Sequence, residues 1–264
     1  MSRKEEKMFY EGYKKADTHM HPNLMRKPEQ AEDFIRTAID KGFDMICFTD
    51  HMYHPVNMLK DRMLSDSLPE YCYRIQNIAE KYRNQIAILC GIEIDYCPQD
   101  EEYIRQVLRS GLFDHILGST HYHLQDIYHV KTSEVERDTF ASLALNNTLA
   151  AVKSGMFDTI SHLDFYRWAM FTPSRFEFPD STYHLEKHIP LIREILQEME
   201  KTGMALEVNA SGIYKGFDNR GPHPEYAILN IAKEYRLRYV YGSDAHKPEN
   251  VGSCYDEIAA AIPL

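Results

Sequence analysis

The stretch Asp17-Thr18-His19-Met20-His21 ends the first apolar segment of the chain and decides between two folds. Seven short apolar segments alternate with segments of helical spacing, the pattern of a parallel sheet built from strand–helix–strand units. Such a sheet is either open or closed into a barrel. An open nucleotide-binding sheet usually carries a glycine-rich turn after its first strand, but here an aspartate and two histidines stand in that place. The sequence therefore predicts a barrel with side-chain chemistry at its strand ends.

The predicted elements run along the whole chain. Strands are expected at Lys15–His19, Phe43–Thr49, Ile86–Glu93, Asp114–Thr120, Phe157–His162, Met204–Asn209 and Arg238–Ser243. The spacing of apolar residues predicts helices over 31–39, 71–83, 101–109, 141–154, 185–201 and 225–235. Tyr53–Pro69 and Phe171–Asp180 are expected to be loops, the first of them covering a site. Because no linker divides the chain, residues 1–264 are expected to form a single domain.

The composition excludes several classes of protein. The formal net charge of −10 argues against nucleic acid as a partner, because phosphate backbones are held by clustered Lys and Arg. No run of 18 apolar residues is present, so no membrane partner is expected. The five cysteines form no CxxC pair, and the first seven residues lack the apolar core of a signal peptide. A cytoplasmic protein with unpaired thiols is predicted.

Histidine or acidic residues follow six of the seven predicted strands at the same end: His19 and His21, Asp50 and His51, Glu93, His121, His162, and Asp244 with His246. Residues i and i+2 of a strand point to the same side, so His19 and His21 can reach one ion together. Imidazoles suit Zn, Mn or Fe, and a bridging carboxylate allows two cations to lie roughly 3.5–4 Å apart. An isolated HxH or DxH is weak evidence, but their joint occurrence predicts a centre of two or three divalent ions.

The other histidines are less informative. His115, His184, His188 and His223 stand in predicted helical or loop contexts and are expected to be structural or solvated. His54, His123 and His129 lie close to the motifs, and their role stays open.

Together the motifs resemble those of the PHP (polymerase and histidinol phosphatase) superfamily, and most closely its histidinol-phosphatase branch. The matching stretches are Asp17–His21, Thr49–His51, Gly91–Tyr96, Gly118–His121, Ser161–Asp164, Leu206–Gly212, Pro222–Glu225 and Gly242–Gly252. The resemblance implies a distorted (β/α)7 TIM-like barrel with a trinuclear centre.

The resemblance also implies a set of ligands for each ion. It assigns His19, His21, Glu93 and Asp244 to the first ion, Glu93, His121 and His162 to the second, and His51 and His246 to the third. Similar proteins usually carry another histidine shortly after the first pair, whereas Pro22–Pro28 contains none. Either His54 or Glu29 replaces it, or the third ion is weakly held or absent.

The implied activity is hydrolysis of a small phosphomonoester, L-histidinol phosphate, by attack of a metal-bridged hydroxide. Glu93, Asp244 and His246 are the predicted catalytic residues. Arg167 and Arg220 are predicted to contact the phosphate, although each could equally be an ordinary surface arginine.

Three alternatives stay open: a related phosphoesterase for another ester, a metal-dependent amidohydrolase and a non-catalytic metal-binding module. Amidohydrolases commonly bridge their ions through a carbamylated lysine, and Glu93 occupies the corresponding strand here, which disfavours the second. The sequence does not indicate an oligomeric state.

Overall fold

Seven parallel strands form one sheet in the computed structural model, which describes residues 12–52, 67–121, 131–172 and 176–262. The strands pair in chain order: β1 (Ala16–Met20), β2 (Met45–Phe48), β3 (Ala87–Asp95), β4 (His115–Ser119), β5 (Thr159–Ile160), β6 (Ala205–Asn209) and β7 (Tyr239–Gly242). Every neighbouring pair is parallel. Each of the seven predicted strands is present, with ends that differ by a few residues.

The sheet closes between its first and last strands. The backbone N–H of His21 donates to the carbonyl of Ala245, and the N–H of Asp244 donates to the carbonyl of His19, both at 2.8 Å. A parallel bridge between Met20 and Ala245 lies in the same place. The barrel is irregular, because β5 has only two residues and the pairing of β1 with β2 shifts register after Asp17. The predicted distorted (β/α)7 barrel is confirmed.

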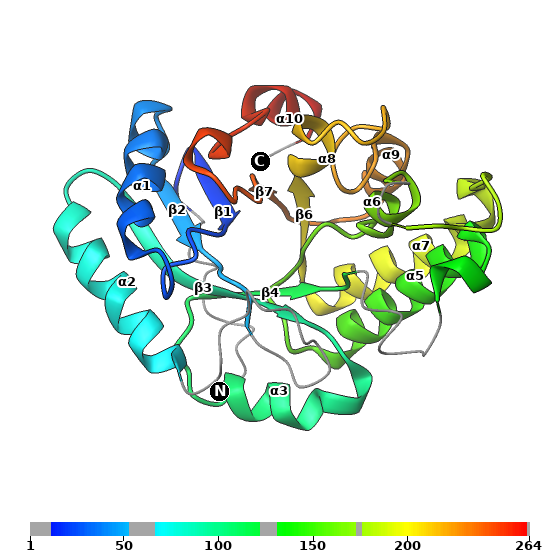
Figure 1. Cartoon of the computed structure of the whole chain (residues 1–264), viewed down its shortest axis with the longest axis horizontal. Coiled ribbons are helices and arrows are strands. Elements are labelled where there is room, and N and C mark those ends of the chain that lie inside the picture. The colour runs from blue at the N-terminus through cyan, green and yellow to red at the C-terminus, as the bar shows by residue number, and fades with distance from the viewer. Residues whose placement is uncertain (1–11, 53–66, 122–130, 173–175, 263–264) are drawn as a thin grey trace.

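Helices surround the strands (Figure 1). Their bounds are α1 (Ala31–Asp40), α2 (Leu68–Tyr82), α3 (Glu101–Leu108), α5 (Arg137–Ser154), α6 (Tyr166–Met170), α7 (Leu185–Thr202), α8 (Ser211–Tyr214), α9 (Tyr226–Ala232) and α10 (Tyr255–Ala261). The helix α1 is typical, because its apolar residues Phe34, Ile35 and Ala38 recur on one face and are all fully buried. Both α5 and α7 end at a glycine with positive φ, Gly155 at 64° and Gly203 at 71°, the usual way to stop a helix.

The six predicted helices are present with shifted ends, and the short α6, α8 and α10 are additional. The predicted loop Tyr53–Pro69 is wrong at its last two residues, where α2 begins, and its first 14 residues lie outside the described part of the chain. Within the described residues no helix is both long and apolar enough to cross a membrane. All five cysteines are free, as predicted. The cytoplasmic location stays a prediction.

Candidate metal centre

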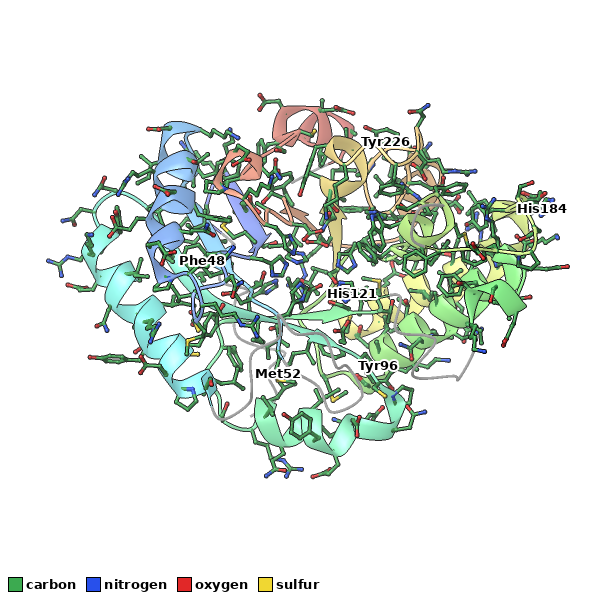
Figure 2. All side chains as sticks on the ribbon, in the orientation of Figure 1. Phe48, Met52, Tyr96, His121, His184 and Tyr226 are labelled. Carbon is green, nitrogen blue, oxygen red and sulfur yellow. The ribbon has the colours of Figure 1, made fainter. Side chains whose placement is uncertain are left out.

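The carboxyl ends of the strands bring the predicted ligands into one cluster. They lie near or just beyond the carboxyl ends of six strands, and they are His19 and His21 (β1), His51 (β2), Glu93 (β3), His121 (β4), His162 (β5), and Asp244 and His246 (β7). Figure 2 shows His121 near the middle of the ring of strands, whereas His184 lies at the outer edge of the molecule. The parallel topology explains the cluster, because all strand ends of one polarity meet at one end of a barrel.

Glu93 stands at the centre of this cluster, with one carboxylate oxygen facing three imidazoles. Its Oε2 lies 2.6 Å from His51 Nδ1, 3.4 Å from His21 Nε2 and 3.6 Å from His19 Nε2. The Nε2 atoms of His19 and His21 are themselves only 2.9 Å apart. Nitrogen and oxygen donors that converge in this way match the donor set of a divalent cation.

The other oxygen of Glu93 faces a second pair of imidazoles. Oε1 lies 3.0 Å from His162 Nε2 and 3.5 Å from His121 Nε2. The hydroxyl of Ser119 donates to the same oxygen, and Nδ1 of His121 bonds to the carboxylate of Asp95. Glu93 therefore has a separate set of nitrogen donors on each side, which is the position of a bridging carboxylate.

Asp244 and His246 complete the cluster on the side of β7. Asp244 Oδ1 lies 3.4 Å from both His21 Nε2 and His246 Nδ1, and 4.0 Å from His19 Nε2. The side chain of His246 is about half exposed (51%), while that of Asp244 is buried. His246 is thus the cluster's most solvent-accessible imidazole.

A buried carboxylate behind the cluster orients His19. Glu207, on β6, lies with Oε1 2.6 Å from Nδ1 of His19. Burial raises the pKa of Glu207, but His19 outweighs this and leaves that pKa below its ordinary value. An ionised Glu207 can only accept, so the imidazole proton stays on Nδ1 and the Nε2 lone pair faces the cluster. Glu207 was not predicted from the sequence because it stands inside the expected strand Met204–Asn209, whereas Glu93 stands at the end of the expected strand Ile86–Glu93.

Three overlapping groups of side chains bring their donor atoms within 4.8 Å of one another: His19–His21–Glu93, His51–Glu93–His121 and His21–His51–His246. Burial, with His51 and His246 nearby, holds the pKa of His21 well below its ordinary value, which favours the neutral form that binds metal. Burial would raise the pKa of Glu93, yet the surrounding imidazoles hold it well below its usual range. His21 and Glu93 therefore present a deprotonated nitrogen and a deprotonated oxygen that fit divalent ions.

A family model described as the PHP domain matches residues 17–211, which contain six of these eight ligands. The chain belongs to the PHP domain family. A second model, described as PHP-associated, matches residues 227–263 of this PHP chain.

Curated relatives and solved structures agree with that assignment. The histidinol-phosphatase of Bacillus subtilis is 29% identical to this chain over an alignment of 267 residues. The alignment includes 92% of this chain and 97% of the relative. The histidinol-phosphatase of Lactococcus lactis is 24% identical over 246 residues, 88% of this chain and 84% of the relative. The crystal structure of the Lactococcus lactis histidinol phosphate phosphatase, complexed with Zn, L-histidinol and phosphate, shares the fold with a TM-score of 0.75 at 22% identity. That match covers 94% of each chain.

Arg167 is placed differently from the prediction. Its side chain is fully buried (0% exposed) on α6, and every N–H donor of its guanidinium has an acceptor. The acceptors, at 2.8–3.3 Å, are the carboxylates of Asp164 and Asp218 and the carbonyls of Gly221 and Pro222. We correct the prediction of phosphate contact, because this guanidinium has no donor left and instead neutralises two carboxylates.

Arg220 remains a prediction as a phosphate contact. Its Nη1 donates to Glu225 Oε2 at 3.2 Å, and its guanidinium lies over the rings of Phe171 and Tyr183 at 5.2 and 5.3 Å. The side chain is 37% exposed, so it can still receive a ligand.

The remaining histidines are mostly structural. His115 lies buried in β4, contrary to the predicted helical or loop context. His223 is fully buried with Nδ1 2.5 Å from Asp164, while His184 and His188 lie beside Asp138. His54, His123 and His129 fall outside the described residues.

Of the two predicted substitutes for the missing histidine, Glu29 is exposed and belongs to none of the three ligand groups. The other substitute, His54, lies outside the described residues, and the ligand shell of a third ion stays a prediction.

Proposed function

We propose that the chain is a metal-dependent phosphomonoesterase that hydrolyses L-histidinol phosphate. The observation that carries the proposal is Glu93, whose two oxygens face separate sets of imidazoles at 2.6–3.6 Å. Divalent ions bound there would neutralise phosphoryl charge and lower the pKa of water to supply a nucleophile. The names of the Bacillus subtilis and Lactococcus lactis relatives support histidinol phosphate as the substrate.

The chain's own residues would hold and orient the reactants. Glu93 would hold neighbouring ions at a fixed spacing. Asp244 would bind the first ion from the side of β7. His246 is half exposed at the edge of the cluster, where it would hold an ion within reach of water and substrate. These roles are proposed for the same three residues that the sequence predicts.

The ions are proposed to be two or three per chain. Zn is the first candidate, because it is the ion named for the Lactococcus lactis structure. Mn and Fe accept the same nitrogen and oxygen donors and are tested beside it. Small-molecule phosphate esters, rather than nucleic acids or membranes, are the proposed partners, in keeping with a net charge of −10.

A panel of substrates tests the proposal. After loading the protein with each metal, phosphate release would be measured for L-histidinol phosphate and several sugar and nucleoside monophosphates, and amine release for an amide substrate. We expect kcat/KM to be highest for L-histidinol phosphate, and to fall by at least about 100-fold in His121→Ala, which removes a donor facing Glu93.

His184→Ala is the matched control, because His184 lies at the periphery beside Asp138 (Figure 2). Preference for a different ester would keep the phosphatase and reject the substrate. Hydrolysis of the amide alone, or equal activity in both alanine variants, would reject the proposed reaction.

A further inference from the structure

Lys215 approaches the cluster from a segment that none of the predicted ligands occupies. It directly follows α8, the short helix after β6. Its Nζ lies 3.2 Å from Oδ2 of Asp244, and the neighbouring Tyr214 hydroxyl donates to the carbonyl of Asp244 at 2.9 Å. The segment after β6 therefore contacts Asp244 at both its side chain and its backbone.

The two oxygens of Asp244 face different groups. Oδ1 faces the imidazoles of His21 and His246, each at 3.4 Å, while Oδ2 faces the ammonium of Lys215. The ammonium is thus separated from the ligand atoms by the width of one carboxylate. A phosphoryl group bound beside Asp244 would lie next to this ammonium.

The ammonium of Lys215 can also bind a further group. Its side chain is 32% exposed, and in the described part of the chain Asp244 is its only hydrogen-bond partner. A lysine ammonium carries further N–H donors and binds phosphate as a point charge. By contrast, each guanidinium N–H of Arg167 is already bonded to an acceptor.

Lys247 is next to His246 in sequence, but its ammonium faces Glu249, whereas that of Lys215 faces Asp244. Its Nζ lies 4.0 Å from Glu249, and its side chain is 71% exposed. Proximity along the chain does not bring it to the cluster, which makes it a matched control.

We propose that Lys215 binds a phosphoryl oxygen of the substrate and stabilises the charge on that group during hydrolysis. The proposal rests on the proposed function only in taking a phosphate ester as the ligand. Inorganic phosphate, the common product of any phosphomonoester hydrolysis, probes the site without reference to the organic part of the substrate.

The test is calorimetric titration of the metal-loaded protein with inorganic phosphate, with metal content measured in the same samples. Lys215→Met is expected to weaken phosphate binding by about 10- to 100-fold, the loss of one charge-assisted hydrogen bond, at unchanged metal content. Lys215→Arg is expected to stay within about 5-fold of the wild type, because it keeps the charge. Lys247→Met should bind phosphate as the wild type does.

Lys215→Gln separates phosphate binding from a role in positioning Asp244. Its amide can still donate to Asp244 but carries no charge, so we expect it to resemble Lys215→Met. Wild-type phosphate affinity in Lys215→Gln or Lys215→Met would overturn the proposal, and so would a loss of metal that accounts for the loss of phosphate. If the wild type hydrolyses no ester but still binds phosphate through Lys215, the proposed function fails and only the phosphate site at Lys215 stands.

Discussion

Nδ1 of His19 and Oε1 of Glu207 lie 2.6 Å apart, although the two residues are separated by 188 positions in the chain. Both side chains are completely buried. The contact fixes the proton of His19 on the side away from the cluster, and so presents Nε2 as a lone-pair donor. Glu207 also accepts from the backbone N–H of His162 at 2.6 Å, which links it to a second predicted ligand.

Glu207→Gln is therefore expected to weaken metal binding by about 10- to 100-fold, the usual cost of losing such a partner behind a metal ligand. Competition with a chelator of known affinity measures the change. Glu234→Gln is the control, because Glu234 pairs with Arg193 on the surface. Equal affinities in the two variants would contradict the role given to Glu207.

Gly242→Ala should disturb the same contact from β7. A methyl group at this position would collide with Oε1 of Glu207 and lie 2.8 Å from Cβ of His19. Because neither neighbour can move without losing the hydrogen bond, we expect unfolding free energy to fall by about 1–3 kcal/mol and metal content to drop. Urea unfolding of the loaded and chelated forms measures both. A variant with wild-type stability and metal content would show that the two side chains can adapt.

Arg167→Met tests the corrected role of Arg167. It would leave the buried carboxylate of Asp164 without its arginine and Asp218 with only Arg220, at 3.9 Å, so we expect a loss of about 3–5 kcal/mol in the free energy of unfolding. Arg193→Met removes a surface pair and should cost less than about 1 kcal/mol. If Arg167→Met were as stable as Arg193→Met but bound phosphate poorly, the original prediction of phosphate contact would be right.

His223 makes a distinct contribution to the pH dependence of stability. Burial disfavours its charged form and lowers its pKa to about 4, against the attraction of Asp164. Between pH 6.5 and 4 the unfolded chain binds a proton here that the folded chain does not, so stability falls as pH falls through this window. The slope attributable to His223 is up to about 1.4 kcal/mol per pH unit.

Unfolding of chelated wild type and chelated His223→Phe across pH 4 to 7 measures this slope, because chelation removes the effect of proton-coupled metal release. The variant should be less stable near neutrality but should show a shallower pH dependence. Parallel curves would reject this assignment.

The sequence was most informative where chemistry lies at strand ends. Glu93 and His121 could be predicted because motif position and parallel topology together determine which side chains meet. The barrel could be predicted from the alternation of strands and helices along the chain, since short buried strands and amphipathic helices differ in the spacing of their apolar residues.

The remaining parts of the site depend on contacts that sequence spacing does not encode. Glu207 meets His19 only through closure of the barrel, and Lys215 reaches Asp244 through the turn after β6. Arg167 pairs with Asp218, 51 positions away, so its burial could not be read from its neighbours in the chain. Long-range pairing of charged groups, rather than local pattern, decided these three cases.

The most direct test of the account is a metal titration of the chelated protein. Phosphate release from L-histidinol phosphate and bound metal per chain would be measured together as Zn, Mn or Fe is returned. We predict no release from the chelated protein, and activity that rises with bound metal until two or three ions are held. Release that is unaffected by chelation, or full metal binding without any release, would contradict the claim that this cluster is a hydrolytic metal centre.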